Sequence, residues 1–146
     1  MHKAEHHVGR LVEVKLASPV SAEEVQEFVR ELMTIIARIP GKYVGVVDLL
    51  EAHLFPPAVT DTLIQVLSAS SPRVDRTAML IGESATFALQ VERVIRSANS
   101  DHRRVFRRAA DMEAWLAESL SAAERVRLRL FLGHLTEGPA RNPAPR

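Results

Sequence analysis

Short apolar segments alternate with longer amphipathic segments along most of the chain. Residues 7–16 carry apolar side chains at nearly alternate positions, which is typical of a strand with one more polar face. Residues 43–50 and 77–82 are short apolar runs, and their brevity and β-branched residues favour buried strands over buried helices. A fourth short strand is predicted at residues 103–106.

Helical spacing of apolar residues characterises the segments between these strands. Ser21 and Glu24 form a capping-box pattern ahead of an apolar stripe that runs to Ile39 and stops at Pro40 and Gly41. Further helices are predicted at residues 57–68, behind Ser84 and Asp111 as capping residues, and at residues 122–134 behind a second capping box of Ser121 and Glu124. The order β-α-β-α-β-α-β-α, followed by one more helix, predicts an α/β fold with a mainly parallel sheet.

Composition and charge narrow the class of protein. The chain of 146 residues is 47% hydrophobic and 25% charged, which fits one globular domain. Its net charge of +1 gives no general electrostatic reason to bind nucleic acid, and no apolar run approaches the ~20 residues of a membrane span. The polar N-terminal segment lacks the apolar core of a signal peptide, and without cysteine there is no disulfide or thiolate chemistry. We therefore expect a cytoplasmic protein with no nucleic-acid partner and no membrane span.

Asp48 and His53 are the strongest candidates for enzyme chemistry. They stand five residues apart across the end of a predicted strand, but acid–base catalysis also needs a third group or a pocket that tunes them. Nothing nearby in the sequence supplies one. Ser84 lacks the second glycine of a nucleophile elbow, so we interpret it as a helix cap. There is no glycine-rich phosphate loop either, and we expect neither an enzyme nor a cofactor.

Two polar clusters receive structural interpretations. His2, His6 and His7 lie near the N-terminus, and we expect an exposed, mobile trio rather than a metal site, which would need further ligands in fixed geometry. The stretch "HRRVFRR" at residues 102–108 crowds four arginines around two apolar residues. Because a nucleic-acid binder spreads its basic charge more widely, we interpret these arginines as a solvated rim or an ion-pair network.

The order of elements, the strand "VVDLL" with its acidic residue, and the stretch "LQVERVIRSANSDHRRVFRRAADMEAWL" together resemble the STAS-like superfamily. The closer resemblance is to the SpoIIAA-like branch, in which an "RRVF"-type strand leads into a helix bearing "WL". It covers roughly residues 5–120. It implies a mixed sheet of about four to five strands with helices mainly on one face. The expected domains are a STAS-like domain at 1–120, an added helix at 121–135 and a disordered, proline-rich tail at 136–146.

The resemblance also bears on regulation by phosphorylation. In the anti-sigma-factor antagonists of this superfamily, the loop after the "D-L" strand carries a "DSSG"-like motif whose serine is phosphorylated. Laid along this chain from Asp48, the motif falls on residues 56–59, where Pro57 and Ala58 occupy the two serine positions. Thr60 follows within the predicted helix, where its hydroxyl can bond back to the backbone. We therefore expect that the phospho-switch is absent.

Two functions from different classes follow from the resemblance. Family members are non-enzymatic modules that often bind protein partners through this loop, and the residues that would make the contact here are Asp48, Leu54, Phe55, Pro57 and Thr60. The alternative is a carrier of a small apolar ligand or lipid, because SpoIIAA-like domains also resemble folds of the CRAL-TRIO type. A carrier needs an apolar cavity of about 300 Å³ or more. The aromatic residues are spread along the chain without an evident pocket cluster, so we prefer the interaction module.

The last helix carries too many apolar residues for one stripe. Leu128, Phe131, Leu132 and Leu135 form one face on a helical period, while Val126 and Leu130 lie beside it. A helix with so wide an apolar arc either fills a groove of its own domain or meets another subunit. We predict a homodimer in which this helix takes part. A strand is the competing interpretation, because "RVRLRLFL" also alternates.

Overall fold

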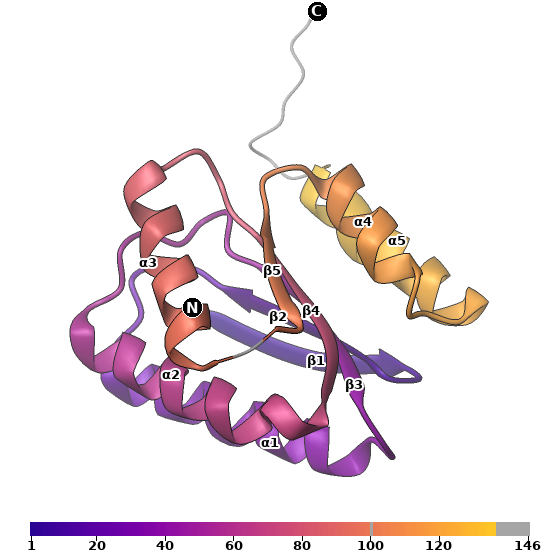
Figure 1. Ribbon diagram of the computed structural model, residues 1–146, viewed down its shortest axis with the longest axis horizontal. Coiled ribbons are helices and arrows are strands. Elements are labelled where there is room, and N and C mark those ends of the chain that lie inside the picture. The colour runs from indigo at the N-terminus through magenta and orange to yellow at the C-terminus, as the bar shows by residue number, and fades with distance from the viewer. Residues whose placement is uncertain (100, 137–146) are drawn as a thin grey trace, which may run out of the picture.

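A computed structural model of the chain describes residues 1–99 and 101–136 and contains one five-stranded sheet (Figure 1). Its strands are β1 (His2–Val8), β2 (Leu11–Leu16), β3 (Tyr43–Asp48), β4 (Val74–Leu80) and β5 (Arg103–Phe106). They lie side by side in chain order, with β1 antiparallel to β2 and all other neighbours parallel. The helices are α1 (Ala22–Arg38), α2 (Pro57–Ser70), the short η1 (Ser71–Arg73), α3 (Ala85–Ser97), α4 (Ala109–Ala117) and α5 (Ala122–Thr136). The predicted α/β fold with a mixed sheet and a C-terminal helix is confirmed.

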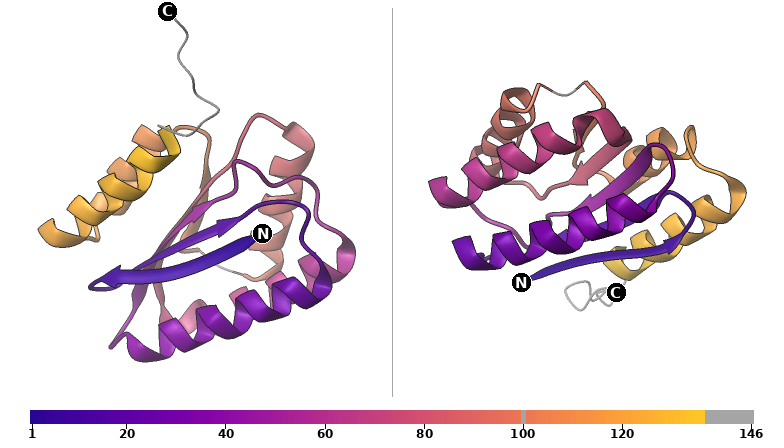
Figure 2. Two further views of the ribbon diagram at one scale, coloured as in Figure 1. Left: turned by 180° about the vertical axis from the view of Figure 1, so that it is seen from behind. Right: turned by 90° about the horizontal axis from the view of Figure 1, so that it is seen from below.

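The helices cover both faces of the sheet (Figures 1 and 2). Helices α1, α2 and α3 pack on one face and enclose the larger hydrophobic core. Helices α4 and α5 pack on the opposite face over a smaller core. Both faces of β3 are therefore covered, which explains why its sequence shows almost no polar alternation.

The N-terminal segment forms a strand that the sequence analysis did not predict. Residues 2–8 pair with β2 through a hairpin whose turn at Gly9 has φ of +56°, a conformation that favours glycine. His2 is largely buried, and its ring contacts the Glu24 carboxylate of α1 at 3.0 Å. The expectation of an exposed, mobile trio is therefore wrong for His2, whereas His6 and His7 are exposed as expected. The strand was missed because β1 is a mostly polar edge strand, so it lacks apolar alternation.

Serine caps start three of the helices as predicted. Ser21 Oγ accepts a hydrogen bond from the backbone N–H of Glu24, and Ser84 Oγ accepts one from Phe87. The capping box of Ser121 and Glu124 is complete, because each side chain accepts from the other residue's backbone N–H.

The predicted cap of α4 at Asp111 is wrong. The helix already begins at Ala109, after Arg108, and its start has no side-chain cap hydrogen bond. Asp111 lies in the first turn of the helix, where a carboxylate is favourable beside the free backbone N–H groups. The sequence pattern therefore found the helix but placed its start a few residues late.

Helix α5 packs on the sheet of its own domain. Leu128 is fully buried and Leu132 is 6% exposed, so the predicted apolar face is confirmed for these two residues and the strand interpretation is wrong. Arg127 joins α5 to β2 through hydrogen bonds of 2.6 and 2.9 Å to the buried Glu13 carboxylate. Val126 and Leu130 remain exposed. The side chain of Leu135 and positions 137–146 of the predicted tail lie outside the described residues.

Candidate functional site at the β3–α2 loop and the cavity beneath it

The loop at residues 49–56 follows β3 at the carboxyl edge of the parallel strands, where α/β proteins commonly bind ligands. Asp48 ends β3 and is only 2% exposed. Its carboxylate accepts a hydrogen bond of 2.9 Å from the backbone N–H of Leu50 and lies 4.0 Å from Lys15 Nζ. Burial raises the pKa of this carboxyl, while the Leu50 hydrogen bond and the charge of Lys15 oppose the rise. Asp48 thus shapes the start of the loop.

The structure gives Asp48 and His53 separate partners. His53 is exposed, and its backbone N–H donates to Ser18 Oγ at 2.8 Å. Within the residues that the structure describes, the side chains of Asp48 and His53 form no hydrogen bond or ion pair with each other. The pair therefore lacks the contact that coupled acid–base catalysis would use.

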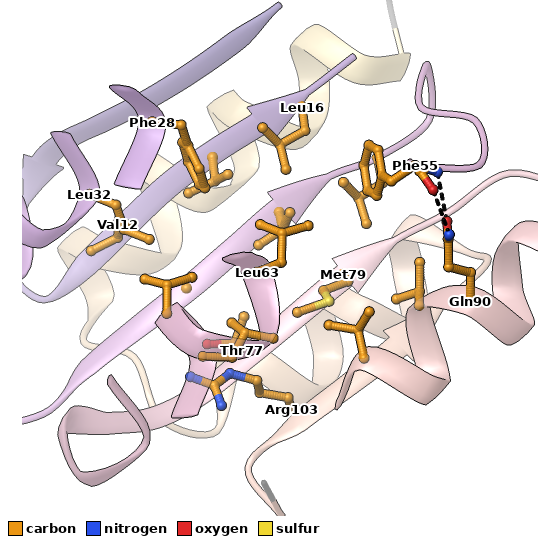
Figure 3. A pocket seen from close by; sticks show the side chains of 18 of the residues that line it. Val12, Leu16, Phe28, Leu32, Phe55, Leu63, Thr77, Met79, Gln90 and Arg103 are labelled. Carbon is orange, nitrogen blue, oxygen red and sulfur yellow. Dashed lines mark hydrogen bonds between the residues drawn. The ribbon is translucent and has the colours of Figure 1, made fainter. Parts of the chain in front are cut away.

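Two hydrogen bonds fix the middle of the loop against α3. The backbone N–H of Phe55 donates to Gln90 Oε1 at 2.8 Å, and Gln90 Nε2 donates back to the Phe55 carbonyl at 2.9 Å (Figure 3). The Phe55 ring turns inward and packs edge to face against Phe87, with ring centroids 5.5 Å apart. Leu54, the preceding residue, is 54% exposed. Phe55 thus faces the core and Leu54 faces the solvent, although they are neighbours in one fixed loop.

Pro57 and Thr60, the other two predicted contact residues, lie in the first turn of α2. Pro57 is exposed at the first helical position, where its missing N–H costs no helical hydrogen bond. The Thr60 hydroxyl donates to the Pro57 carbonyl at 2.9 Å, which is the back-bonding expected from the sequence. The five predicted contact residues thus divide between the buried Asp48 and Phe55 and the more accessible Leu54, Pro57 and Thr60.

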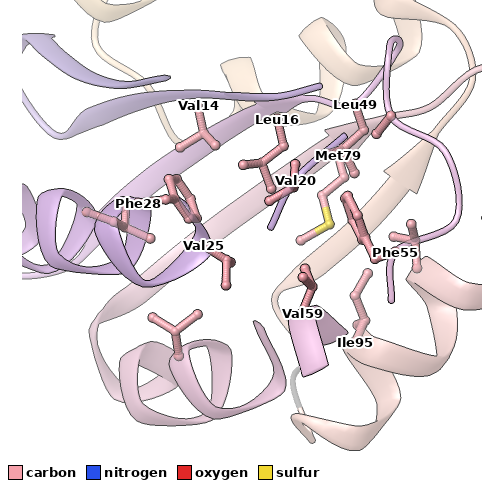
Figure 4. Close-up of a cluster of buried hydrophobic side chains, with 14 of the residues drawn as sticks. Val14, Leu16, Val20, Val25, Phe28, Leu49, Phe55, Val59, Met79 and Ile95 are labelled. Carbon is pink, nitrogen blue, oxygen red and sulfur yellow. The ribbon is translucent and has the colours of Figure 1, made fainter. Parts of the chain in front are cut away.

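A cavity of about 90 Å³ lies between the sheet and helices α1–α3 (Figure 3). It lies within the larger hydrophobic core, part of which Figure 4 shows. Its floor is formed by the strands β2, β3 and β4, through side chains that include Val12, Val14, Leu16, Val47 and Met79. Its walls are formed by the helices and the loop, through side chains that include Phe28, Leu32, Phe55, Leu63, Val66 and Val91. Phe28 and Phe55, far apart in the sequence, therefore line one cavity, which sequence spacing alone could not indicate.

Two polar residues, Thr77 and Arg103, lie at one end of this cavity, although its exposed lining is almost entirely apolar. Gly45, Thr77 and Arg103 are register partners on β3, β4 and β5, so they form a row across its floor. Arg103 is only 5% exposed, and its guanidinium donates to the hydroxyls of Ser70 and Ser71 at 3.1 and 3.0 Å. The interpretation of the arginines as a solvated rim is wrong for Arg103. Alternation along β5 turns it toward the core, and the short stretch gave no sign of which face is covered.

The neighbouring arginines lie elsewhere. Arg104 stacks over the Trp115 ring on the opposite face, with its guanidinium carbon 4.9 Å from the ring centroid. Arg107 donates to the carbonyl of Gly82 at 3.1 Å, and Arg108 is exposed. The arginines of the "HRRVFRR" stretch therefore lie in different environments. Although they are close in sequence, they do not form one basic patch.

Glu5, His7 and Glu13 form the one group of described side chains whose atoms are close enough for a shared metal ion. Their candidate ligand atoms all lie within 4.8 Å of one another. However, both oxygens of Glu13 already accept hydrogen bonds from Arg127, so this cation compensates the buried carboxylate. Because Arg127 already pairs with Glu13, the closeness of these three side chains does not by itself define a metal centre.

The fold places the chain in the α/β class, with a five-stranded mixed sheet covered on both faces. Comparisons with protein-family models, with curated proteins and with solved structures returned no match. The comparisons thus assign no family, and the STAS-like resemblance rests on the sequence and on the order of elements. Among the described residues, no helix has both the length and the hydrophobicity that crossing a membrane requires.

Proposed function

We propose that the protein is a non-enzymatic regulatory module of STAS-like type that recognises a protein partner through the β3–α2 loop. The observation that carries the proposal is a fixed loop with outward-facing leucines. Leu50 and Leu54 are 42% and 54% exposed, although the Leu50 N–H donates to Asp48 and Gln90 holds the Phe55 backbone beside Leu54 through two hydrogen bonds. A preorganised apolar surface loses little conformational entropy on binding, which favours recognition.

A third exposed leucine lies on α3, the helix that holds the loop. Leu89 is 60% exposed and precedes Gln90 on α3, just as Leu54 precedes the Phe55 backbone that Gln90 holds. Leu54 and Leu89 therefore flank the same pair of hydrogen bonds from opposite elements. Large exposed apolar side chains on a loop and on the helix that holds it are consistent with a protein-interaction surface. A non-enzymatic role is supported by the separate partners of Asp48 and His53.

Site-specific crosslinking tests this proposal. A photo-reactive amino acid at position 54 should yield a discrete heterologous protein adduct in the cells that make this protein. The same amino acid at position 37, exposed on α1, is the matched control and should not yield that adduct. Equal adducts from both positions, or none from position 54, would contradict recognition through the loop.

A second candidate function is favoured by the cavity beneath the loop: binding of a small ligand. At about 90 Å³ the cavity falls well below the volume of about 300 Å³ that drug-sized ligands occupy. It is also smaller than an apolar cavity of about 150 Å³ that binds benzene in another protein. A lipid does not fit this space, but a molecule of a few non-hydrogen atoms does. The ligand would contact Phe55 and so could influence the loop from below.

A further inference from the structure

We propose that strand β1 pairs with β1 of a second copy of this chain, antiparallel and in a register centred on Ala4, so that two sheets join into one. Strand β1 lies at the outer edge of the described sheet, where β2 is its neighbouring strand (Figure 2). An edge strand offers backbone N–H and C=O groups to another strand. This surface is separate from the β3–α2 loop, and the inference does not depend on the function proposed for that loop.

The hydrogen bonds between β1 and β2 show which backbone groups point outward. The Ala17 N–H donates to the Met1 carbonyl at 2.8 Å, and the Met1 nitrogen donates to the Ala17 carbonyl at 2.9 Å. These two residues are therefore a hydrogen-bonded pair of the antiparallel ladder, in which such pairs alternate with pairs that are not bonded. Up to the bulge after His6, the even-numbered residues of β1 thus direct their backbone groups away from β2. These residues are His2, Ala4 and His6.

The outward backbone groups limit the registers that a second copy can adopt. Two antiparallel copies form hydrogen-bonded pairs only where an outward residue of one meets an outward residue of the other. A two-fold axis through Ala4 pairs Ala4 with its own copy and His2 with His6, so it uses all three outward residues of each strand. Axes through Lys3 or Glu5 also satisfy the alternation, but they leave one of the three outward residues unused.

The charges of β1 select the same register. With the axis at Ala4, Lys3 lies directly opposite Glu5 of the second copy, and the symmetry makes this pair twice. Both are pairs without backbone hydrogen bonds, in which opposed side chains approach most closely. An axis through Lys3 or Glu5 would instead place that residue opposite itself, and like charges directly opposite are destabilising. Charge complementarity thus favours the register that also forms the most hydrogen bonds.

Pairing with β2 leaves the same charges poorly matched within one chain. Lys3 lies opposite Lys15, and Glu5 lies opposite Glu13. Lys15 and Glu13 have partners of opposite charge on other elements. Glu5 has His7 at 3.0 Å, whereas Lys3 forms no ion pair within the part of the chain that the structure describes. Glu5 of a second copy would supply the opposite charge that Lys3 lacks.

Helix α5 lies beside the same edge. It contacts β1 and β2, and its Arg127 pairs with Glu13 on the face of the sheet that also carries Glu5. A two-fold axis between antiparallel edge strands is perpendicular to the sheet, so it keeps the α5 helices of both copies on one face. The strand pairing therefore agrees with the predicted homodimer in which α5 takes part, and it adds a register that the sequence did not indicate.

A single introduced cysteine tests the register, because the chain contains no cysteine of its own. At the proposed axis the two Cα atoms of residue 4 lie about 5.5 Å apart, a distance that a disulfide bridges. Mild oxidation of Ala4→Cys should therefore give a covalent dimer. His6→Cys is the matched control on the same edge, where the two copies lie four residues out of register, about 13 Å apart, and should stay uncrosslinked. Equal crosslinking of both variants would overturn the inference.

Reversed charges test the pairing of Lys3 with Glu5. Lys3→Glu and Glu5→Lys each place like charges opposite each other, so each should raise the dissociation constant of its dimer at least about tenfold. An equimolar mixture should dimerise again, because every opposed pair in the mixed dimer carries opposite charges. Lys42→Glu, which reverses an exposed charge outside β1, should dimerise like the wild type. Analytical ultracentrifugation at pH 8, where an ordinary imidazole is neutral, measures all four.

The remaining outcomes assign the edge differently. Lys3→Glu decides the matter if Glu5→Lys does not fold, because Lys3 is exposed and has no ion pair to lose among the described residues. A wild type that is monomeric at high micromolar concentration, or a Lys3→Glu variant that dimerises as tightly as the wild type, overturns the inference. If Ala4→Cys forms a disulfide with a different protein in cells and none with itself, the edge receives another partner and the second copy is wrong.

Discussion

At the scale of single residues, the environment of a side chain decides its role, and sequence position alone could not reveal that environment. The sequence singled out Asp48 as a candidate for acid–base chemistry or partner contact, whereas in the structure its buried carboxylate accepts a hydrogen bond from the Leu50 N–H and shapes the start of the loop. Arg103 was grouped with its exposed neighbours, because the four-residue strand gave no indication of which face α1–α3 would cover. Gln90 was missed altogether, since its partner is a backbone group 35 residues away.

Asp48 gives a prediction about pH and stability. Burial raises the pKa of Asp48 in the folded state above its ordinary value of 3.8. At pH values between these two pKa values, the folded state therefore binds more protons than the unfolded state. The contribution of Asp48 to stability is therefore greatest below 3.8 and falls as pH rises through the raised pKa. Asp48→Asn keeps an acceptor for the Leu50 N–H, and it should match or exceed the wild-type free energy of unfolding at pH 7.

Urea denaturation at a series of pH values measures this effect. Asp61→Asn, on the exposed surface of α2, serves as the control substitution. If Asp48→Asn is clearly less stable than the wild type at pH 7 while the control is not, the Asp48 charge stabilises the fold through Lys15 and the account of its burial is wrong.

Phosphorylation of the loop gives the second prediction at this scale. Pro57 and Ala58 carry no hydroxyl, and the Thr60 hydroxyl is engaged with the Pro57 carbonyl in the first turn of α2. Incubation with a kinase that phosphorylates anti-sigma-factor antagonists should therefore leave residues 51–60 unmodified. Mass spectrometry of the loop peptide checks this outcome, and stoichiometric phosphate on Thr60 would show that a switch is present.

At the scale of elements, apolar periodicity predicted the α-helices α1–α5 and all strands except β1, and it did not predict the short η1. The helices were recognisable because each combines a stripe or cluster of apolar residues with a start or stop signal, such as the capping box of Ser121 and Glu124. Strand β1 escaped because hydrogen bonds to β2, and not apolar alternation, hold a polar edge strand in place. The side of the sheet that each helix covers was also beyond the pattern, since it depends on the path of the connections.

The ion pair between α5 and β2 gives a prediction for an element. Glu13 is 3% exposed, so Arg127→Met leaves a buried carboxylate without its partner and should lower the free energy of unfolding by about 3–5 kcal/mol. The matched control is Arg129→Met on the same helix, whose ion pair with Glu113 is largely exposed and should contribute less than about 1 kcal/mol. Chemical denaturation measures both. Equal losses for the two variants would contradict the anchoring role of Arg127.

At the scale of the whole molecule, α5 packs against the same sheet as the rest of the chain. Leu128 and Leu132 join the same core as Met112 and Leu116 of α4, so both helices cover one face of the sheet. The sequence analysis treated residues 121–135 as an addition because the STAS-like resemblance ended near residue 120. The resemblance carried no information about what covers the second face of the sheet. The wide apolar arc of residues 122–134 was the better indication that this helix packs against the sheet.

The predicted homodimer is best tested on the outer side of α5. Val126 and Leu130 are 56% and 52% exposed one helical turn apart, and a second copy of the chain would cover them. Light scattering at high micromolar concentration should give the mass of a dimer for the wild type and of a monomer for Leu130→Glu. Deleting the helix is less informative, because the loss would also remove Leu128 and Leu132 from the core. A monomeric wild type would contradict the dimer.

The central claim, that a fixed loop presents leucines to a protein partner, is tested most directly by an affinity measurement. The partner captured through position 54 is purified and titrated against the wild type, Leu54→Asp and Ala37→Asp, the last of which places the same charge on the exposed surface of α1. Leu54 contributes no described core contact, so Leu54→Asp should fold normally yet bind at least about tenfold more weakly. Ala37→Asp should bind like the wild type. Unchanged affinity for Leu54→Asp would contradict recognition through the β3–α2 loop.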